Sequence, residues 1–93
     1  MSRKKFKICG RPEDYEKYFK PAGVFFEMLQ ENELSAEELE VIKLCDFENY
    51  NQTEAASLLR VSRTTIQRLL KSARFKITDS ILNSKAVKIN GKN

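Results

Sequence analysis

Residues 51–71 read NQTEAASLLRVSRTTIQRLLK, and this stretch decides the fold. Asn51 is followed three residues later by Glu54, which is the spacing of a capping box at the start of a helix. Ser62 is a second cap, and the apolar residues after it repeat with helical spacing for about 20 residues. Three to four residues, 59–62, are left to connect the two helices. The stretch therefore predicts a helix-turn-helix.

The apolar residues of this stretch meet the steric demands of two helices that cross at a steep angle. Ala56 is small where the two backbones must approach. The side chains expected to fill the shared angle are Ala55, Leu59, Val61, Ile66 and Leu69. We also expect Leu58 in the buried face of the first helix, and Ile77 and Ile81 in the buried stripe of the second. Arg60 stands where such turns often need a positive φ, which costs a non-glycine residue on the order of 1 kcal/mol.

One face of the second helix, residues 63–82, must then point outward. The polar residues on its first turns are Arg63, Thr64, Gln67, Arg68 and Lys71. Arginine can bond guanine with two hydrogen bonds, glutamine can bond adenine in the same way, and threonine suits a phosphate or a thymine methyl group. We therefore predict that this helix enters the major groove of double-stranded DNA.

Further residues around the two helices are predicted to support this contact. The free N–H groups that follow Ser62 suit a phosphate. Gln52 and Thr53, at the start of the first helix, are placed to touch the DNA backbone. Arg74 and Lys76 are expected to extend the positive surface along the second helix.

The net charge of +4 hides a segregation along the chain. Residues 1–11 carry five Lys/Arg and no acid, residues 12–50 carry three bases and eleven acids, and residues 51–93 carry nine bases and two acids. A basic C-terminal half indicates a surface for a polyanion. The alternative interpretation is that these charges keep a small domain soluble. The motif inside the basic half favours DNA.

Composition excludes several other classes of protein. The longest uninterrupted apolar run is Val24–Phe26, far short of the roughly 20 residues of a membrane span. The basic N-terminus is followed by no apolar stretch, so we expect no export and a cytoplasmic location. Two cysteines and no histidine do not make a common zinc site, and no metal or cofactor is expected. Cys45 is interpreted as a helix residue near the core and Cys9 as part of a strand.

The rest of the chain predicts a mainly α fold of three to four helices with short β-strands near both termini. In residues 1–34 we expect a strand at 4–9, a loop at 13–23 whose aromatic rings anchor on the core, and a short apolar helix face at 24–29. Residues 35–83 hold the helix-turn-helix domain, beginning with a capping box at Ser35 and Glu38 and a hydrophobic staple of Leu34 on Leu39. Its first helix runs to about Asp46 and stops at Asn49. Residues 84–93 form a terminal strand and a tail, and this strand pairs with strand 4–9 within the chain or between two chains.

Several segments, in order along the chain, resemble a family of small prokaryotic proteins known as domain of unknown function 134, which is predicted to bind DNA. The matching segments are residues 19–23, 37–40, 52–56, 61–63 and 72–74, followed by Lys85, Ala86, Ile89 and Gly91. More distantly, residues 40–81 resemble region 4 of sigma factors, the module that reads the promoter −35 element. The resemblance implies a sigma region 4-like fold and a role in transcription regulation. It carries the DNA-contacting role to Ser62, Arg63, Thr64, Gln67 and Arg68.

The sequence departs from the family pattern at three places. Asn49 and Arg60 stand where the family usually has glycine. One cysteine lies near the N-terminus where some relatives have more, so metal binding there is not carried over. No second sigma-like domain is seen, so a full sigma role is not implied.

The sequence is compatible with three classes of function to different degrees. The first is sequence-specific DNA binding, with a homodimer expected because one such module reads few base pairs. The second is a protein-interaction module that docks on RNA polymerase through the acidic segment 27–48. The third, an enzyme, is not expected, because the chain has no histidine and neither cysteine has a visible activating partner. A three-helix bundle with a solvated basic face is the non-functional alternative.

Overall fold

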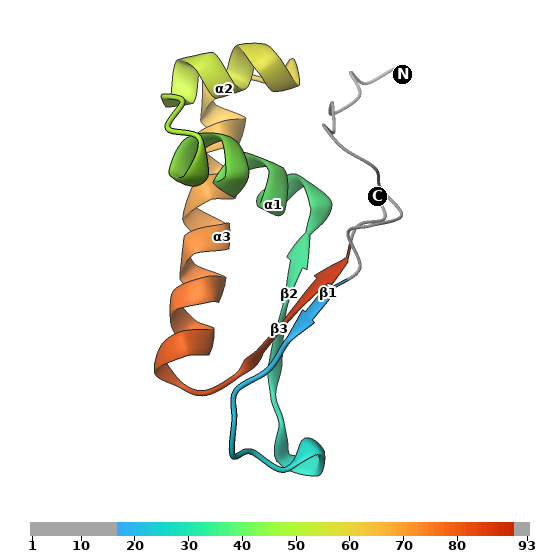
Figure 1. The fold of residues 1–93 in the computed structure, drawn as a ribbon. Coiled ribbons are helices and arrows are strands. Elements are labelled where there is room, and N and C mark those ends of the chain that lie inside the picture. Colours follow the sequence, from blue (N-terminus) through green and yellow to red (C-terminus); the bar gives the residue numbers. More distant parts are fainter. Residues whose placement is uncertain (1–16, 91–93) are drawn as a thin grey trace.

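The computed structural model describes residues 17–90, which form a mainly helical fold with a small sheet (Figure 1). The strands are β1 (Lys17–Phe19), β2 (Glu31–Ser35) and β3 (Ala86–Asn90). The helices are α1 (Ala36–Ile42), α2 (Gln52–Leu59) and α3 (Arg63–Leu82), together with a 3-10 turn, η2 (Phe26–Met28), and a π-helical segment, η3 (Lys43–Phe47). The expectation of a mainly α fold is confirmed for this part of the chain, as is a short strand near the C-terminus.

The sheet has the strand order β1-β3-β2, so the C-terminal strand lies in its centre. Ile89 pairs with Lys17 of β1 in antiparallel register and with Leu34 of β2 in parallel register. The predicted terminal strand is thereby confirmed. Its expected partner, the strand at 4–9, lies outside the described residues. Strands β1 and β2 are findings of the structure, because the sequence pattern predicted a loop at 13–23 and no strand at 31–35.

Two clusters of apolar side chains make the core. The first joins α1 and η3 to α2 and α3 and contains Val41, Leu44, Ala55, Ala56, Leu59, Ile66, Leu69 and Leu70. The second lies between the sheet and α3, where Leu34 and Ile89 pack on Ala73. Leu39 packs against this second cluster, of which Leu34 is a member, as a staple between the two residues requires. Both clusters use α3, so this helix is the element on which the rest of the fold is assembled.

The predicted helix starts are confirmed atom by atom. At α1 the amide of Glu38 donates to Ser35 Oγ (3.1 Å) while its carboxylate accepts from the Ser35 amide (2.9 Å). At α2 the same exchange joins Asn51 and Glu54, at 2.8 and 2.9 Å. Ser62 caps α3 by accepting from the Thr65 amide (3.1 Å). Each cap satisfies amides that the first helical turn leaves without a partner.

The helix ends rely on left-handed residues that are not glycine. Asn49, Arg60 and Ser84 have φ values of 67°, 62° and 54°. After α2, the amide of Val61 donates to Ala56 O (3.0 Å) and the amide of Arg60 donates to Ser57 O (3.3 Å). These two bonds form a Schellman motif, which needs a left-handed residue at Arg60. The positive φ predicted at Arg60 is therefore confirmed.

The helix that begins with α1 widens into η3 before it stops. The amide of Glu48 donates to the carbonyl of Lys43, five residues earlier (2.9 Å). This confirms the expected helix end near Asp46 and the stop at Asn49, and adds a π-helical turn that the sequence pattern did not predict. Cys45 in this turn is partly buried against the first core cluster, as expected.

Six apolar or aromatic side chains that were expected on the core are exposed instead. Leu58 is 44% exposed and Ile81 is 73% exposed, because the buried stripes of α2 and α3 are narrower than the helical pattern indicated. Phe25 and Met28, expected on a packed helix face, are 76% and 73% exposed around the 3-10 turn η2. Phe19 is 57% exposed on β1 and does not anchor a loop, and Tyr18 beside it is 43% exposed.

Arg60→Gly should raise the free energy of unfolding by about 0.5–1 kcal/mol. The left-handed conformation costs arginine roughly 1–2 kcal/mol, and the greater freedom of glycine in the unfolded chain offsets part of the gain. Thermal unfolding should show a melting temperature roughly 2–8 °C higher. The matched control is Ser57→Gly, at an exposed, right-handed position of α2, which should lower stability by about 0.5 kcal/mol. If Arg60→Gly also lowered stability, the backbone at residue 60 would not carry the strain described.

Candidate nucleic-acid interface

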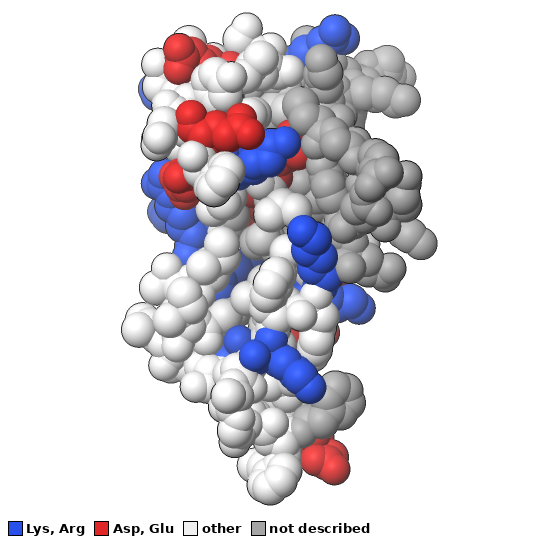
Figure 2. All heavy atoms as spheres, in the orientation of Figure 1, with Lys and Arg blue, Asp and Glu red and all other residues white. Residues whose placement is uncertain are grey.

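The outward face of α3 is polar and basic over its first half. We call the residues Arg63, Thr64, Gln67, Arg68 and Lys71 the basic face, and all five are exposed as predicted. Thr64, Arg68 and Lys71 follow one another at spacings of four and three residues, so they lie in one row along the helix. Figure 2 shows Lys and Arg side chains along the edge of the molecule where the upper half of α3 runs. The face is presented by a helix whose opposite side is the core.

The cations along α3 divide into two groups by their partners. Within residues 17–90, Arg68 and Lys71 have no ion-pair or hydrogen-bond partner, and Arg63 bonds a neutral amide. Arg74, one turn further along, forms two bonds to the Asp46 carboxylate, at 3.0 and 2.6 Å. Lys76 is paired with Glu38 at 2.9 Å. The unpaired positive charge of α3 is therefore concentrated in its first half.

Arg74 and Lys76 do not extend the positive surface in the way the sequence suggested. The hydrogen bond from Arg74 lowers the pKa of Asp46, and the same bond raises the pKa of Arg74, so the two groups hold each other charged and compensated. Lys76 is turned inward, since its ammonium also donates to the Glu33 carbonyl (2.7 Å) and its side chain is only 29% exposed. Contact between Arg74 and DNA stays a prediction. For this contact the Arg74 guanidinium must give up its bonds to Asp46 and bond a DNA phosphate instead.

The start of α2 lies beside the start of α3. Gln52, on the first turn of α2, accepts a hydrogen bond from Arg63 Nη1 through its side-chain oxygen (3.3 Å). Thr53 is exposed next to it. Two residues predicted to contact DNA from different helices are thus brought together, and Gln52 orients the guanidinium group. Ser62 is exposed at the helix start, with Oγ also 3.0 Å from Thr65 Oγ1.

Arg60 belongs to this surface, although the sequence analysis treated it only as a poor turn residue. It is exposed in the turn that precedes the basic face, and within the described chain it has no ion-pair partner. The positive charge of Arg60, next to the basic helix in the sequence, was the signal that could have identified it as part of the candidate DNA-binding surface. With Arg63, Arg68 and Lys71 it makes four exposed cations on the turn and the first half of α3.

A buried carboxylate fixes α3 against α1. Glu38 is 5% exposed and accepts from the Ser35 amide, the Ser72 hydroxyl and the Lys76 ammonium. Burial raises the pKa of Glu38, but these three donors outweigh it and hold the pKa below its ordinary value. One charged group therefore connects a helix start on α1 with two positions on α3.

A second polar cluster fixes the far half of α3 to the sheet. The Asn32 amide nitrogen lies 3.0 Å from Asp79 Oδ2 and 2.9 Å from Ser80 Oγ, and Lys85 Nζ lies 2.9 Å from the same Asp79 oxygen. Hydrogen bonds from Lys85, Asn32 and Asn83 lower the pKa of Asp79 to about 2. Two polar clusters, one around Glu38 and one around Asp79, therefore fix the orientation of α3, and with it the direction in which the basic face points.

Other chemistry finds little support among residues 17–90. No three potential metal ligands of the His, Cys, Asp or Glu type come together there. Burial raises the pKa of the Cys45 thiol, with Asp46 adding to this effect, so the thiol is held in its unreactive protonated form. None of the helices in this part of the chain combines the length and the apolar character needed to cross a bilayer.

Comparison with known proteins identifies relatives along nearly the whole chain. The family model described as "Protein of unknown function DUF134" matches residues 1–93. A UPF0251 protein of Dehalococcoides mccartyi is 49% identical over 74 residues, which cover 80% of this chain and 63% of that protein. UPF0251 proteins of Caldanaerobacter subterraneus and Aeromonas salmonicida are 46% identical over 83 residues and 41% identical over 80 residues, covering 89% and 86% of this chain and 70% and 76% of theirs.

The chain thus spans less than two thirds of the length of its Dehalococcoides relative. No solved structure matches it. The match of the family model over residues 1–93 includes the two helices and the turn that carry the basic face. The chain belongs to the family described as protein of unknown function DUF134.

Proposed function

We propose that this chain binds double-stranded DNA in a sequence-specific manner, with α2 and α3 acting as a sigma region 4-like helix-turn-helix, and that it regulates transcription. The observation that carries the proposal is the distribution of paired and unpaired cations. Arg74, Lys76 and Lys85 are compensated by acids, whereas Arg68 and Lys71 are left free for an external anion. Among residues 17–90, Lys17, Lys20 and Lys88 are also without an ion-pair partner, but they lie on or beside the sheet, whereas Arg68 and Lys71 lie together on the first half of α3.

The residue types between the free cations suit base recognition. Thr64 and Gln67 are exposed among the arginines, and an arginine or a glutamine at such a position can form two hydrogen bonds to one base edge. In this arrangement α3 lies in the major groove, while Gln52 and Thr53 at the start of α2 face the phosphate backbone. Arg74 lies at the edge of the contact, where Asp46 competes with phosphate.

Selection of bound duplexes from a random pool tests the proposal, followed by fluorescence anisotropy on an enriched duplex at several salt concentrations. We expect enrichment of a defined motif and an affinity that falls as salt rises. Four cations predict a slope of log K against log salt of down to about −4 for each copy bound. A pool that shows no enrichment, or an affinity that is independent of salt, would contradict DNA binding through this face.

A further inference from the structure

The outward face of α3 changes character halfway along the helix. Beyond the basic face the large exposed apolar side chains on α3 are Phe75, Ile81 and Leu82, which are 66%, 73% and 75% exposed. Phe75 and Leu82 are seven residues apart and share one side of the helix. These side chains do not bind phosphate, and they lie beyond the first half of α3 that carries the basic face.

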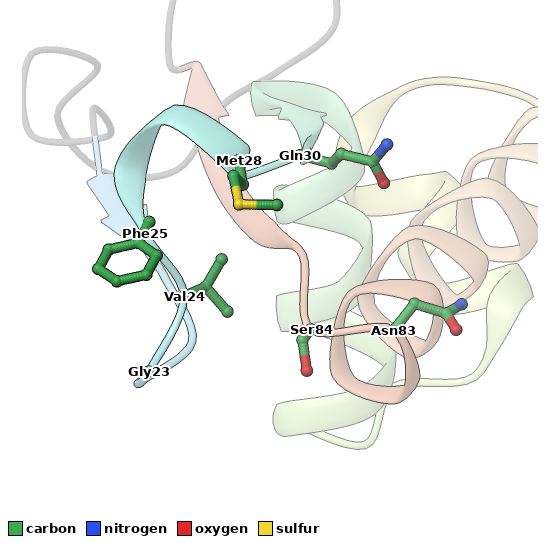
Figure 3. A pocket seen from close by; sticks show the side chains of 7 residues that line it. All are labelled: Gly23, Val24, Phe25, Met28, Gln30, Asn83 and Ser84. Carbon is green, nitrogen blue, oxygen red and sulfur yellow. The ribbon is translucent and has the colours of Figure 1, made fainter.

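The apolar surface continues from the end of α3 onto the loop that contains η2. A cavity of about 340 Å³ lies between the two, and the residues that line it are Gly23, Val24, Phe25, Met28, Gln30, Asn83 and Ser84. Figure 3 shows the loop side chains on one side of this cavity and Asn83 and Ser84, which directly follow Leu82, on the other. None of the seven lining residues is charged. We call Phe25, Met28, Phe75, Ile81 and Leu82 the basal patch.

We propose that the basal patch is the contact between two copies of this chain. Its area is the first argument. Each of the five side chains is between 66% and 76% exposed. Together they offer several hundred Å² of apolar surface, which approaches the roughly 800 Å² that each partner contributes to a standard interface. An apolar patch of several hundred Å² is as large as the largest patch on a typical monomer, and such patches often mark an interaction site.

The shape of the patch is the second argument, because the patch holds both a projection and a recess. Leu82 projects from the last turn of α3, and the cavity opens beside the next two residues, Asn83 and Ser84. In a two-fold contact the same surface of both copies meets. Leu82 of each copy can then enter the cavity of the other copy, so a single two-fold contact fills both cavities.

The distribution of charge is the third argument. It favours a second copy of the chain over a charged partner as the occupant of the basal patch. Figure 2 shows the end of α3 itself in white, although Lys or Arg side chains lie beside it and one acidic side chain lies at the foot of the molecule. A chain with a net charge of +4 repels its own copy unless the contact lies away from the cations. Arg63 and Leu82 are separated by nearly the full 20-residue length of α3, or about 28 Å at 1.5 Å per residue. Contact through the basal patch keeps the two basic faces apart and uncovered.

Sedimentation velocity across a range of protein concentrations tests this contact without DNA, so its outcome is separable from that of the proposed function. We expect a monomer–dimer equilibrium in the parent chain. Leu82→Lys and Met28→Lys alter the patch from two different elements and should each weaken dimerisation by about 30-fold or more. Lysine at residue 82 is also compatible with the negative end of the α3 dipole, so folding is kept.

Leu58→Lys is the matched control, because Leu58 is an exposed leucine on α2, outside the patch. It should leave the dimer unchanged, and circular dichroism should show the same helix content in all variants. The inference is overturned if the parent chain is monomeric at about 100 µM, or if Leu82→Lys and Met28→Lys both dimerise like the parent. Growth into open-ended oligomers would overturn the two-fold arrangement.

Discussion

Replacing Arg63 or Arg68 with alanine should weaken binding to a selected duplex by about 1–3 kcal/mol for each residue. This corresponds to an increase in Kd of about 5-fold to 150-fold. Both side chains are exposed on the first half of α3, and an arginine that bonds one guanine with two hydrogen bonds carries discrimination of this size. Anisotropy titrations at one fixed salt concentration measure the change.

Arg68→Lys separates charge from recognition. Lysine keeps the positive charge but lacks the planar fork of arginine, so we expect the salt slope of the parent together with weaker discrimination against altered sites. Lys20→Ala is the control, because Lys20 is exposed after β1, away from α2 and the first half of α3 (Figure 1), and its loss removes the same unit of charge. Lys20→Ala should change Kd by less than about 3-fold. If Arg63→Ala, Arg68→Ala and Arg68→Lys all bound the selected duplex and its altered sites like the parent, the basic face would not be the DNA contact.

The part of the fold that sequence predicted well is the part controlled by local contacts. The caps at Asn51 and Ser62 join residues three positions apart, so their chemistry is visible in a short window. The turn at Arg60 is also local, because its two closing bonds reach back only three and five residues. The position and the exposure of the basic face followed from these elements and from the apolar stripe that α3 buries.

The sheet could not be predicted, because its strands are stabilised by partners far away in the sequence. Residues 31–35 read ENELS, with two glutamates and an asparagine, which have weak preference for strands. They form β2 because β3 lies beside them and Leu34 packs in a core with Ile89 and Ala73. β1 has the same origin, since its three residues are all exposed and gain structure from pairing with β3.

The partners of the cations were hidden from sequence for the same reason. Arg74 and Asp46 are 28 residues apart, and Lys76 and Glu38 are 38 residues apart. A count of charges along α3 gives one continuous basic strip. The folded chain shows that the strip is compensated in its second half, which confines the candidate site to the first half and to Arg60.

Glu38→Ala should have the largest effect on stability of the substitutions considered, lowering the free energy of unfolding by about 3 kcal/mol. Removing one member of a buried pair leaves the other charge without compensation, which typically costs 3–5 kcal/mol. The lower end applies because Lys76 is 29% exposed and can recover some water. The melting temperature should fall by more than about 10 °C. Glu37→Ala, one residue earlier on the same helix turn, is the control and should cost less than about 1 kcal/mol.

Acid titration shows whether the charge of Glu38, and not only its shape, provides this stability. The pKa of Glu38 is lowered in the folded chain, so its contribution is complete above the ordinary glutamate pKa near 4.5 and is lost as the pH falls through the lowered value. Asp46 and Asp79 titrate in the same direction, so the parent chain loses stability on acidification from several groups. Glu38→Gln keeps the side-chain volume and removes one of these titrating groups. The free energy of unfolding should therefore fall less below about pH 4.5 in this variant than in the parent. Because the same carboxylate fixes α3 against α1, the variant should also bind DNA more weakly at a temperature where it is fully folded. Equal acid sensitivity in both proteins would show that Glu38 is not the charged anchor of α3.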